Sequence, residues 1–380
     1  MIECKRKIPR KAARRLANDN KGFINAGKAK KDEFYTQLTD IEKEMRYYRD
    51  YFKGRIVFCN CDDPYESNFF KYFAMNFNVL GLKKLIATCY CNSPIFGMEI
   101  DLFDGSEEPI RLTKKKAVEF RIAEIPDMNG DGAIDLADAE LLIRKRKPYR
   151  VLKGDANYPA GDFRSKECIE LLKEADVVVT NPPFSLFREY VAQLMEYKKD
   201  FIIIGNQNAI TYKEIFPLIK DNKMWYGASI HSHGRDFRVP DNYPLQAYEF
   251  RTDEHGNKFI NVKGVRWFTN VDYEQRHEDM ILYKKYTPEE YPKYDNYDAI
   301  EVGKMNEIPV DYDGVMGVPI SFIDKYNPEQ FEIIGQTHSG DKTEQTESLR
   351  TDSKHRHRGR INGKEKYARI LIRRKQSPQK

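Results

Sequence analysis

Several features that would mark a secreted or membrane protein are missing from this sequence. Its six cysteines, at positions 4, 59, 61, 89, 91 and 168, are too few for a disulfide framework, and a reducing compartment explains them. No run approaches the roughly 18 consecutive apolar residues of a membrane span. The first residues are basic but lack the apolar stretch of a signal peptide, and there are no internal repeats. We therefore expect a globular cytoplasmic protein with no membrane partner.

The cysteines leave one metal site open as an alternative. Cys59 and Cys61 are two residues apart, as are Cys89 and Cys91, so each pair lies on one face of a strand, and two neighbouring strands could join them around zinc. Structural zinc sites more often place two to four residues between paired cysteines. This spacing favours buried, inert thiols.

Positive charge is concentrated at the two ends of the chain. Residues 1–31 carry eleven Lys or Arg against two acids, and residues 354–375 carry ten against one, although the net charge is only +5. We interpret residues 1–31 as a basic N-terminal arm and residues 341–380 as a basic C-terminal segment. Such solvated arms suit a polyanion, because each neutralised phosphate releases counterions. Tails that only increase solubility are the alternative.

Strand and helix patterns alternate between residues 54 and 208. Short apolar strands are expected within 54–64, 83–91, 176–180 and 200–208, with helices between them. An earlier helix carries Ile41, Met45, Tyr48 and Phe52 at helical spacing, with Thr39 or Asp40 as its N-cap, and the next helix begins near Ser67 or Asn68. The pattern predicts an open, doubly wound α/β sheet, in which ligands bind at the carboxyl ends of the strands.

An insertion at residues 98–150 interrupts this alternation and contains a calcium-loop spacing at 127–138. Oxygen-bearing side chains occupy loop positions one, three, five, nine and twelve, with Gly132 at position six. The candidate metal ligands are Asp127, Asn129, Asp131, Asp135 and Asp138. An acidic turn that caps the following helix is the alternative interpretation.

A polar amide, two prolines and an aromatic ring follow the strand at 176–180. The side-chain oxygen of Asn181 and the carbonyl of Pro182 can accept both hydrogens of an exocyclic amine. Pro182 and Pro183 lack N–H donors and restrict the backbone, while Phe184 offers a face for a flat ring. These candidate catalytic residues form a clamp for an amino group on an aromatic base. A rigid turn with Asn as turn former is the alternative.

Eight segments, in order along the chain, carry a family resemblance: DEFYTQ, IVFCNCDDPYESNFFKYFA, LGLKKLIA, GDFRS, VVVTNPPFSLFREY, YPKYDNYDAI, DYDGVMGVPISF and NPEQFEIIG. In these segments the chain resembles the EcoRI-type adenine-specific DNA methyltransferases, which transfer a methyl group from S-adenosylmethionine to adenine N6. The resemblance implies a Rossmann-like S-adenosylmethionine-dependent methyltransferase sheet with a smaller, loop-rich DNA-recognition domain. It also implies double-stranded DNA as the partner.

The resemblance assigns roles to individual residues. Asn181 and Pro182 would hold N6 of a flipped adenine, and Phe184 would stack on its ring. N6 would then attack the sulfonium methyl group directly. The implied cofactor-binding residues are Tyr35, Thr36, Asp62, Asp63, Pro64, Asp162 and Phe163. The chain departs from the family pattern in residues 65–69, which lack the usual glycines, and at the end of the second strand, which lacks a ribose-binding acid.

Composition also divides the chain, because residues 231–340 are rich in Tyr, Asp, Asn and Pro. Residues 32–230 would form the catalytic domain and residues 231–340 the target-recognition region, whose candidate base-reading residues are Arg235, Arg238, Asn242 and Gln246. The expected function is site-specific modification of DNA in a restriction-modification or phage or orphan system. A catalytically silent DNA-binding protein and a methylase of RNA or protein glutamine are the alternatives. The oligomeric state is not fixed by the sequence, and a monomer is compatible with it.

Overall fold

The structure, a computed structural model, describes residues 36–61, 67–89, 117–132, 137–138, 141–142, 150–229, 234–239, 250–338, 344–351 and 357–375. The chain divides into two compact units. The first comprises Met1–Lys199, Ile203–Gly205 and His233–Val265, and the second comprises Asp200–Ile202, Asn206–Ser232 and Arg266–Lys380. Within the described ranges, no helix is long and apolar enough to cross a membrane.

The largest sheet contains the strands that the sequence predicts, in the order β4-β3-β2-β1-β5-β6-β11-β7. Strand β1 pairs in parallel with both β2 and β5, whereas β3 runs antiparallel to β2 and β4. The protein is therefore a mixed α/β protein, as predicted. The strands of this sheet are β1 (Ile56–Cys59), β2 (Lys84–Thr88), β3 (Val118–Ile122), β4 (Arg150–Val151), β5 (Val177–Thr180), β6 (Asp200–Asn206), β7 (Trp225–Tyr226) and β11 (Val265–Thr269).

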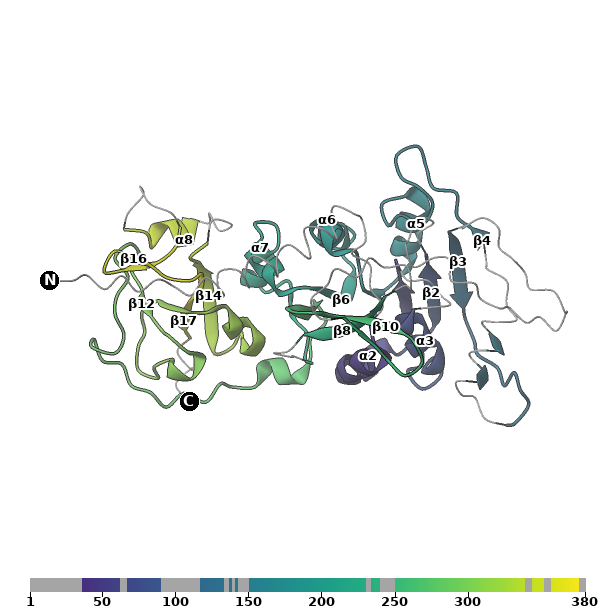
Figure 1. The fold of residues 1–380 in the computed structure, drawn as a ribbon, viewed down its shortest axis with the longest axis horizontal. Helices are drawn as coiled ribbons and strands as arrows, with labels where there is room; N and C mark the ends of the chain where they lie inside the picture. Colours follow the sequence, from purple (N-terminus) through teal and green to yellow (C-terminus); the bar gives the residue numbers. More distant parts are fainter. Residues whose placement is uncertain are drawn as a thin grey trace. The chain divides into compact units, whose positions relative to one another are not determined.

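Helices cover both sides of the parallel strands in the first unit. Figure 1 shows α5 (Lys166–Glu174) and α6 (Phe187–Glu196) on one side and α2 (Leu38–Met45) and α3 (Asn68–Met75) on the other. Helix α3 begins where predicted, because the Ser67 hydroxyl accepts the N–H groups of Phe69 and Phe70. The Ser165 hydroxyl caps α5 in the same way. Both caps lie where the chain leaves a loop and enters a helix that packs on the sheet.

The first helix departs from the prediction at its start but not in its buried face. The four residues at helical spacing are all buried, with exposed fractions of 2% or less. The N-cap is Gln37, not Thr39 or Asp40, and its side chain makes no capping hydrogen bond. After Met45 the chain continues as the 3-10 helix η1 (Arg46–Phe52). Packing against α3 and the sheet therefore determines this segment more than a side-chain cap.

Three smaller sheets complete the described fold. The first unit holds β8 (Arg235–Val239), β9 (Phe250–Thr252) and β10 (Lys258–Val262), in the order β8-β10-β9. The second unit holds a four-stranded sheet, order β12-β13-β17-β14, and the β15-β16 hairpin. The elements of the second unit are β12 (Ile300–Glu301), β13 (Met316–Pro319), β14 (Phe331–Gln336), β15 (Arg360–Ile361), β16 (Lys364–Glu365), β17 (Arg369–Arg374), α7 (Phe216–Lys220) and α8 (Glu344–Ser348).

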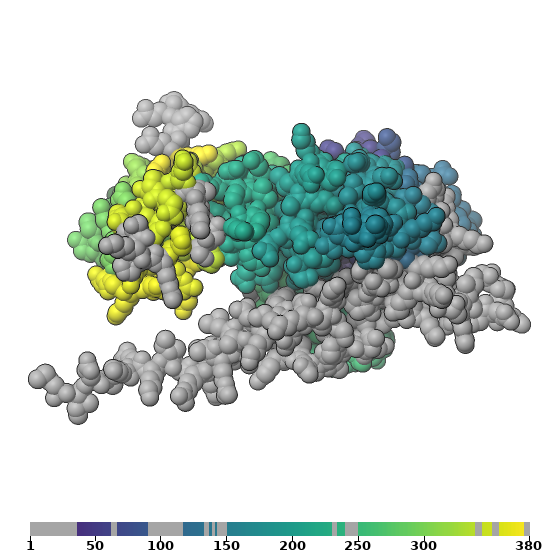
Figure 2. All heavy atoms as spheres, turned by 90° about the horizontal axis from the view of Figure 1, so that it is seen from above, coloured from purple at the N-terminus to yellow at the C-terminus, as the bar shows by residue number. Residues whose placement is uncertain are grey.

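The basic C-terminal segment is folded over residues 357–375 and is not a solvated arm there. Strand β17 pairs with both β13 and β14, and its residues Ile370, Leu371 and Ile372 are fully buried. In the space-filling view the yellow residues of the C-terminal part of the chain pack against green residues of the same unit (Figure 2). The cations of this segment are thus carried on a rigid scaffold.

Candidate active site

The carboxyl ends of three parallel strands are joined by a buried polar row that the sequence did not reveal. The strand registers bring Asn60, which follows β1, level with Thr88 of β2 and Thr180 of β5. The Thr180 hydroxyl donates to the Asn60 carbonyl, and the Thr88 hydroxyl donates to the Asn60 side-chain oxygen at 3.2 Å. All three residues are at most 1% exposed. The row fixes the ends of β1, β2 and β5, where ligands bind in open α/β sheets.

The predicted clamp starts one residue beyond this row. Asn181, Pro182 and Pro183 are buried, with Asn181 at 9% exposure, and Phe184 is half-buried. The Pro183 carbonyl accepts the N–H of Leu186 at 2.9 Å, which starts the 3-10 turn η2 (Phe184–Leu186). Over the described part of the chain, no hydrogen bond reaches the Pro182 carbonyl. The turn therefore uses one proline carbonyl and leaves the other available as an acceptor next to Asn181.

Thr36 lies just before α2 and contacts the first residue of α3. Its backbone carbonyl accepts a hydrogen bond from the side-chain amide of Asn68 at 2.7 Å. Its side chain is 3% exposed, and its hydroxyl oxygen is buried with no partner among the residues described. A buried hydroxyl without a partner is unfavourable unless a ligand completes it. Thr36 is therefore suited to contact a bound cofactor.

Asp162 and Phe163 lie in a loop that is attached to the helix following the clamp. Both carboxylate oxygens of Asp162 are bound by Arg164, with Nε–Oδ1 and Nη2–Oδ2 distances of 2.9 and 2.8 Å. This hydrogen-bonded pairing raises the pKa of Arg164 above its ordinary value. Arg164 also donates to Glu189 of α6 at 2.8 Å, and the Phe163 ring packs edge-on against Tyr190 with centroids 4.9 Å apart. Sequence reasoning missed Arg164, although this basic residue is visible two positions after Asp162 in the GDFRS segment.

Several predicted site residues lie outside the described residues. They are Tyr35, Asp62, Asp63 and Pro64 of the cofactor set, Asp135 of the calcium loop, and Asn242 and Gln246 of the base-reading set. Arg235 of the base-reading set is described and is only 4% exposed, with its Nη1 3.2 Å from the Asp40 carboxylate. Its burial excludes it as a surface reader of bases.

The described residues do not support calcium binding at 127–138. The Asp127 carboxylate accepts the N–H groups of Gly130 and Gly132 at 2.6 and 2.9 Å. The fully buried Asp138 carboxylate accepts those of Met128 and Asn129 at 2.6 and 3.1 Å. In the described ranges no cluster of three His, Cys, Asp or Glu side chains could hold a metal ion. Backbone N–H groups therefore satisfy the carboxylates of Asp127 and Asp138, as in an acidic turn.

Cys91 of the zinc alternative lies outside the described residues, so the structure describes only three of its four cysteines. Cys59 and Cys89 are buried, and the Cys89 sulfur accepts the backbone N–H of Val118 at 3.4 Å. Cys61 is half-exposed, and Cys168 is fully buried. The described cysteines are free thiols that pack in the fold.

Burial of Cys168 predicts that its thiol is unreactive in the folded protein. Burial raises the pKa of this thiol from its ordinary 9.0 to about 11. The contribution of the protonated Cys168 thiol to the free energy of unfolding is therefore complete below pH 9.0 and is lost as the pH rises through about 11. At pH 8 we expect iodoacetamide to alkylate Cys168 only after unfolding in urea, as mapped by mass spectrometry. Alkylation of folded Cys168 as fast as Cys61 would contradict this prediction.

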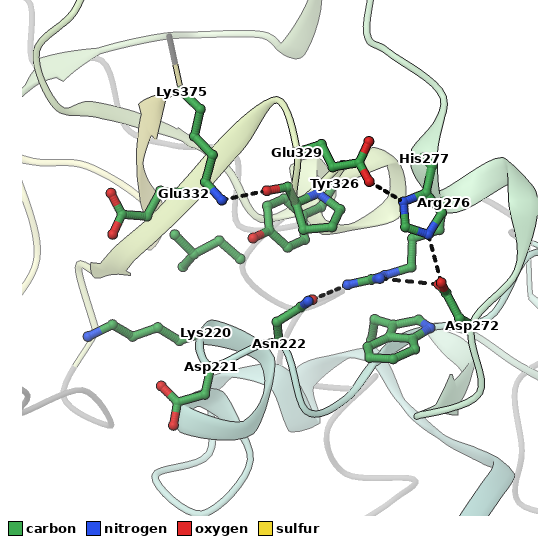
Figure 3. Close-up of a pocket in the computed structure, with 13 residues that line it drawn as sticks. Lys220, Asp221, Asn222, Asp272, Arg276, His277, Tyr326, Glu329, Glu332 and Lys375 are labelled. Atoms are coloured by element: carbon green, nitrogen blue, oxygen red, sulfur yellow. Dashed lines mark hydrogen bonds and ion pairs between the residues drawn. The ribbon is translucent and has the colours of Figure 1, made fainter. Parts of the chain in front are cut away.

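A pocket of about 550 Å³, lined by charged, aromatic and aliphatic side chains, lies within the second unit (Figure 3). The Arg276 guanidinium stacks 3.8 Å above the centroid of the Trp225 ring and lies 3.3 Å from Asp272. His277 bridges Asp272 and Glu329, at 2.8 and 3.1 Å. Burial alone would raise the pKa of Asp272, but the hydrogen bond from His277 and the nearby positive charges lower it below the ordinary value. The pocket contains none of the clamp residues, and Asp272, Arg276, His277 and Glu329 pair with one another in it.

Comparison with known proteins agrees with the resemblance seen in the motifs. The family model described as adenine-specific methyltransferase EcoRI matches residues 22–375. The chain belongs to this family. It is an adenine-specific methyltransferase, and the predicted family and enzyme class are confirmed. Methyltransferases of this kind use S-adenosylmethionine.

Three relatives match nearly end to end. The chain is 46% identical to the Type II methyltransferase M.EcoRI of Escherichia coli, over 94% of this chain and 97% of the relative. Identity to M.MpnI of Mycoplasma pneumoniae is 36%, over 93% and 98% of the two chains. For M.MgeORF184P of Mycoplasma genitalium it is 35%, over 93% and 99%. No solved structure matches the chain significantly.

Proposed function

We propose that this methyltransferase transfers a methyl group to N6 of an adenine that is flipped out of a short, specific site in duplex DNA. The site would be protected as part of a restriction-modification system, or modified in a phage or orphan system. The observation that carries the proposal is the Pro182 carbonyl beside Asn181, at the carboxyl edge of the parallel strands, which accepts no hydrogen bond from a described residue. Family membership favours adenine over protein glutamine as the acceptor.

The clamp residues act on the amino group of the base. Adenine N6 is a poor nucleophile because its lone pair is delocalised into the ring. The Asn181 oxygen and the Pro182 carbonyl accept its two hydrogens and stabilise the positive charge that develops as N6 becomes tetrahedral. The buried prolines hold both acceptors in place, so little reorganisation is needed during the reaction. Phe184, which remains half-exposed, stacks on the ring of the flipped base.

The cofactor would bind along the ends of β1 and β2. When bound, S-adenosylmethionine supplies an electrophilic methyl group on a sulfonium. Thr36 would contact its methionine end, because its buried hydroxyl lacks a partner among the described residues. Asp162 and Phe163 would lie near its adenine, with Asp162 held in one orientation by Arg164. Tyr35, Asp62, Asp63 and Pro64 complete the proposed set.

Duplex DNA has to be opened locally, because a stacked base is out of reach. Unpairing costs a few kcal/mol, which phosphate contacts from the basic segments at both ends of the chain would offset. We assign residues 32–230 to a Rossmann-like catalytic domain and residues 231–340 to target recognition. Arg238, half-buried on β8, remains in the proposed base-reading set after Arg235 is excluded.

Mapping of N6-methyladenine tests this function. The native protein and its Asn181→Ala variant are expressed in cells that lack adenine methylation, and their DNA is sequenced with a method that detects the modified base in context. Methylation at one short motif, present with the native protein and absent with the variant, is the expected result. Unmodified DNA from cells that contain soluble native protein would overturn the proposal and favour a catalytically silent DNA-binding protein or an RNA substrate.

A further inference from the structure

A basic and aromatic surface on the β15-β16 hairpin has no role in the site described above. Residues 357–367 carry four Lys or Arg side chains against one Glu. None of the four cations forms an ion pair with another described residue, and the Tyr367 ring is 77% exposed. We call this set the hairpin surface: Arg358, Arg360, Lys364, Lys366 and Tyr367.

Hydrogen bonds hold the hairpin rigidly on residues 294–297, part of the YPKYDNYDAI segment. The Asp295 carboxylate accepts the N–H groups of Asn362 and Gly363 in the hairpin turn, at 3.1 and 2.7 Å. The Asn296 side chain accepts the N–H of Arg360 at 2.8 Å and donates to the Arg358 carbonyl at 2.9 Å. The backbone of the hairpin is thus fixed along its first strand and at the turn.

Tight packing beneath the hairpin adds to this support. The Tyr294 ring lies so close to Gly359 that a Cβ atom there would be 2.6 Å from a ring carbon. The Tyr294 hydroxyl donates to the Glu301 carboxylate, which also accepts from Arg369 Nε at 3.1 Å. Burial and the adjacent Glu301 charge raise the pKa of Tyr294, so its hydroxyl remains a donor at neutral pH. The segment that the family resemblance singled out is therefore a base for the hairpin.

We propose that the hairpin surface binds the phosphate backbone of duplex DNA outside the methylated base, an inference that rests on the proposed function. Clustered cations without carboxylate partners can neutralise phosphates without first breaking an ion pair, and a rigid backbone reduces the entropy lost on binding. An exposed tyrosine among them can donate a hydrogen bond to a phosphate oxygen. Such contacts position the duplex and carry no sequence information.

The test compares the salt dependence of DNA binding in two matched full-length variants. Lys364→Gln/Lys366→Gln removes two charges from the hairpin surface. Lys285→Gln/Lys325→Gln removes two exposed lysines of the same unit that likewise form no ion pair with described residues. Fluorescence anisotropy with a labelled random-sequence duplex gives the slope of log Kd against log salt concentration. We expect the slope of the hairpin variant to be smaller than that of the native protein by about 2, because each phosphate contact contributes about 0.9. The control variant should have the native slope.

At about 0.1 M salt, the hairpin variant should bind roughly 10- to 60-fold more weakly. At saturating DNA and low salt both variants should still methylate DNA, which shows that they are folded. An unchanged slope, or an equal loss in the control variant, would overturn the hairpin assignment while native methylation leaves the proposed function standing. Conversely, a hairpin-dependent slope in a protein that methylates no DNA would refute the proposed function and support the binding surface.

Discussion

Replacement of Asn181 by alanine is expected to slow methyl transfer by about 10²- to 10³-fold while DNA binding is retained. The alanine removes one of two acceptors for the N6 hydrogens, and the Pro182 carbonyl alone then stabilises the developing positive charge. Because that charge is largest in the transition state, the loss should fall on the rate and not on affinity. Single-turnover transfer of labelled methyl groups, with enzyme in excess over duplex, measures the step directly.

Asn181→Asp is the matched control for this prediction. Aspartate keeps an acceptor oxygen at the same place, and its negative charge favours a cationic N6, so its loss of rate should be smaller than that of alanine. Both variants should bind the duplex within a few-fold of the native protein. Equal losses in the two variants, or a loss below threefold in alanine, would show that acceptor chemistry at position 181 does not drive the reaction.

Local patterns were sufficient to predict four of the eight strands of the large sheet and the place of the clamp. Short apolar runs located β1, β2, β5 and β6, and Ser67 was one of two predicted N-cap residues for α3. The clamp residues follow β5, and the strand end is visible in the sequence because the β-branched run 177–180 stops before Asn181. Each of these predictions uses only residues that are close to one another in the sequence.

The polar row beneath the clamp depends instead on register, which a single strand does not encode. Asn60, Thr88 and Thr180 are separated by tens of residues and look like ordinary strand ends in the sequence. Their hydrogen bonds follow only when Phe58 is known to pair with Val178 and Cys59 with Ala87. For the same reason the burial of Arg235 against Asp40 was hidden from sequence reasoning.

Composition misled the interpretation of the C-terminal segment. Ten Lys or Arg residues in 354–375 obscured the apolar run at 370–372, which is too short to stand out in so basic a segment. In the fold, this run is the centre of β17, paired on both sides. A high density of charged residues describes the exposed side chains of such a strand. Its three buried residues determine whether the strand packs into the fold.

Thr180→Val is expected to damage both stability and catalysis. Valine has nearly the shape of threonine but lacks the hydroxyl that donates to the Asn60 carbonyl. The buried carbonyl then loses this hydrogen bond, at a cost of about 1–3 kcal/mol in the free energy of unfolding. Since residue 180 immediately precedes Asn181, relaxation of the strand end displaces the clamp. A displacement near 1 Å can slow a reaction by about 10²-fold.

Thr88→Val separates the two effects, because it removes the other hydroxyl that donates to Asn60 without adjoining the clamp. Urea unfolding should show a similar loss of stability in both variants. Single-turnover rates, measured below the unfolding transition with saturating cofactor and DNA, should fall much further in Thr180→Val. Equal rates would mean that the row only stabilises the sheet, whereas a selective loss would show that the Thr180 to Asn60 hydrogen bond positions the acceptors for catalysis.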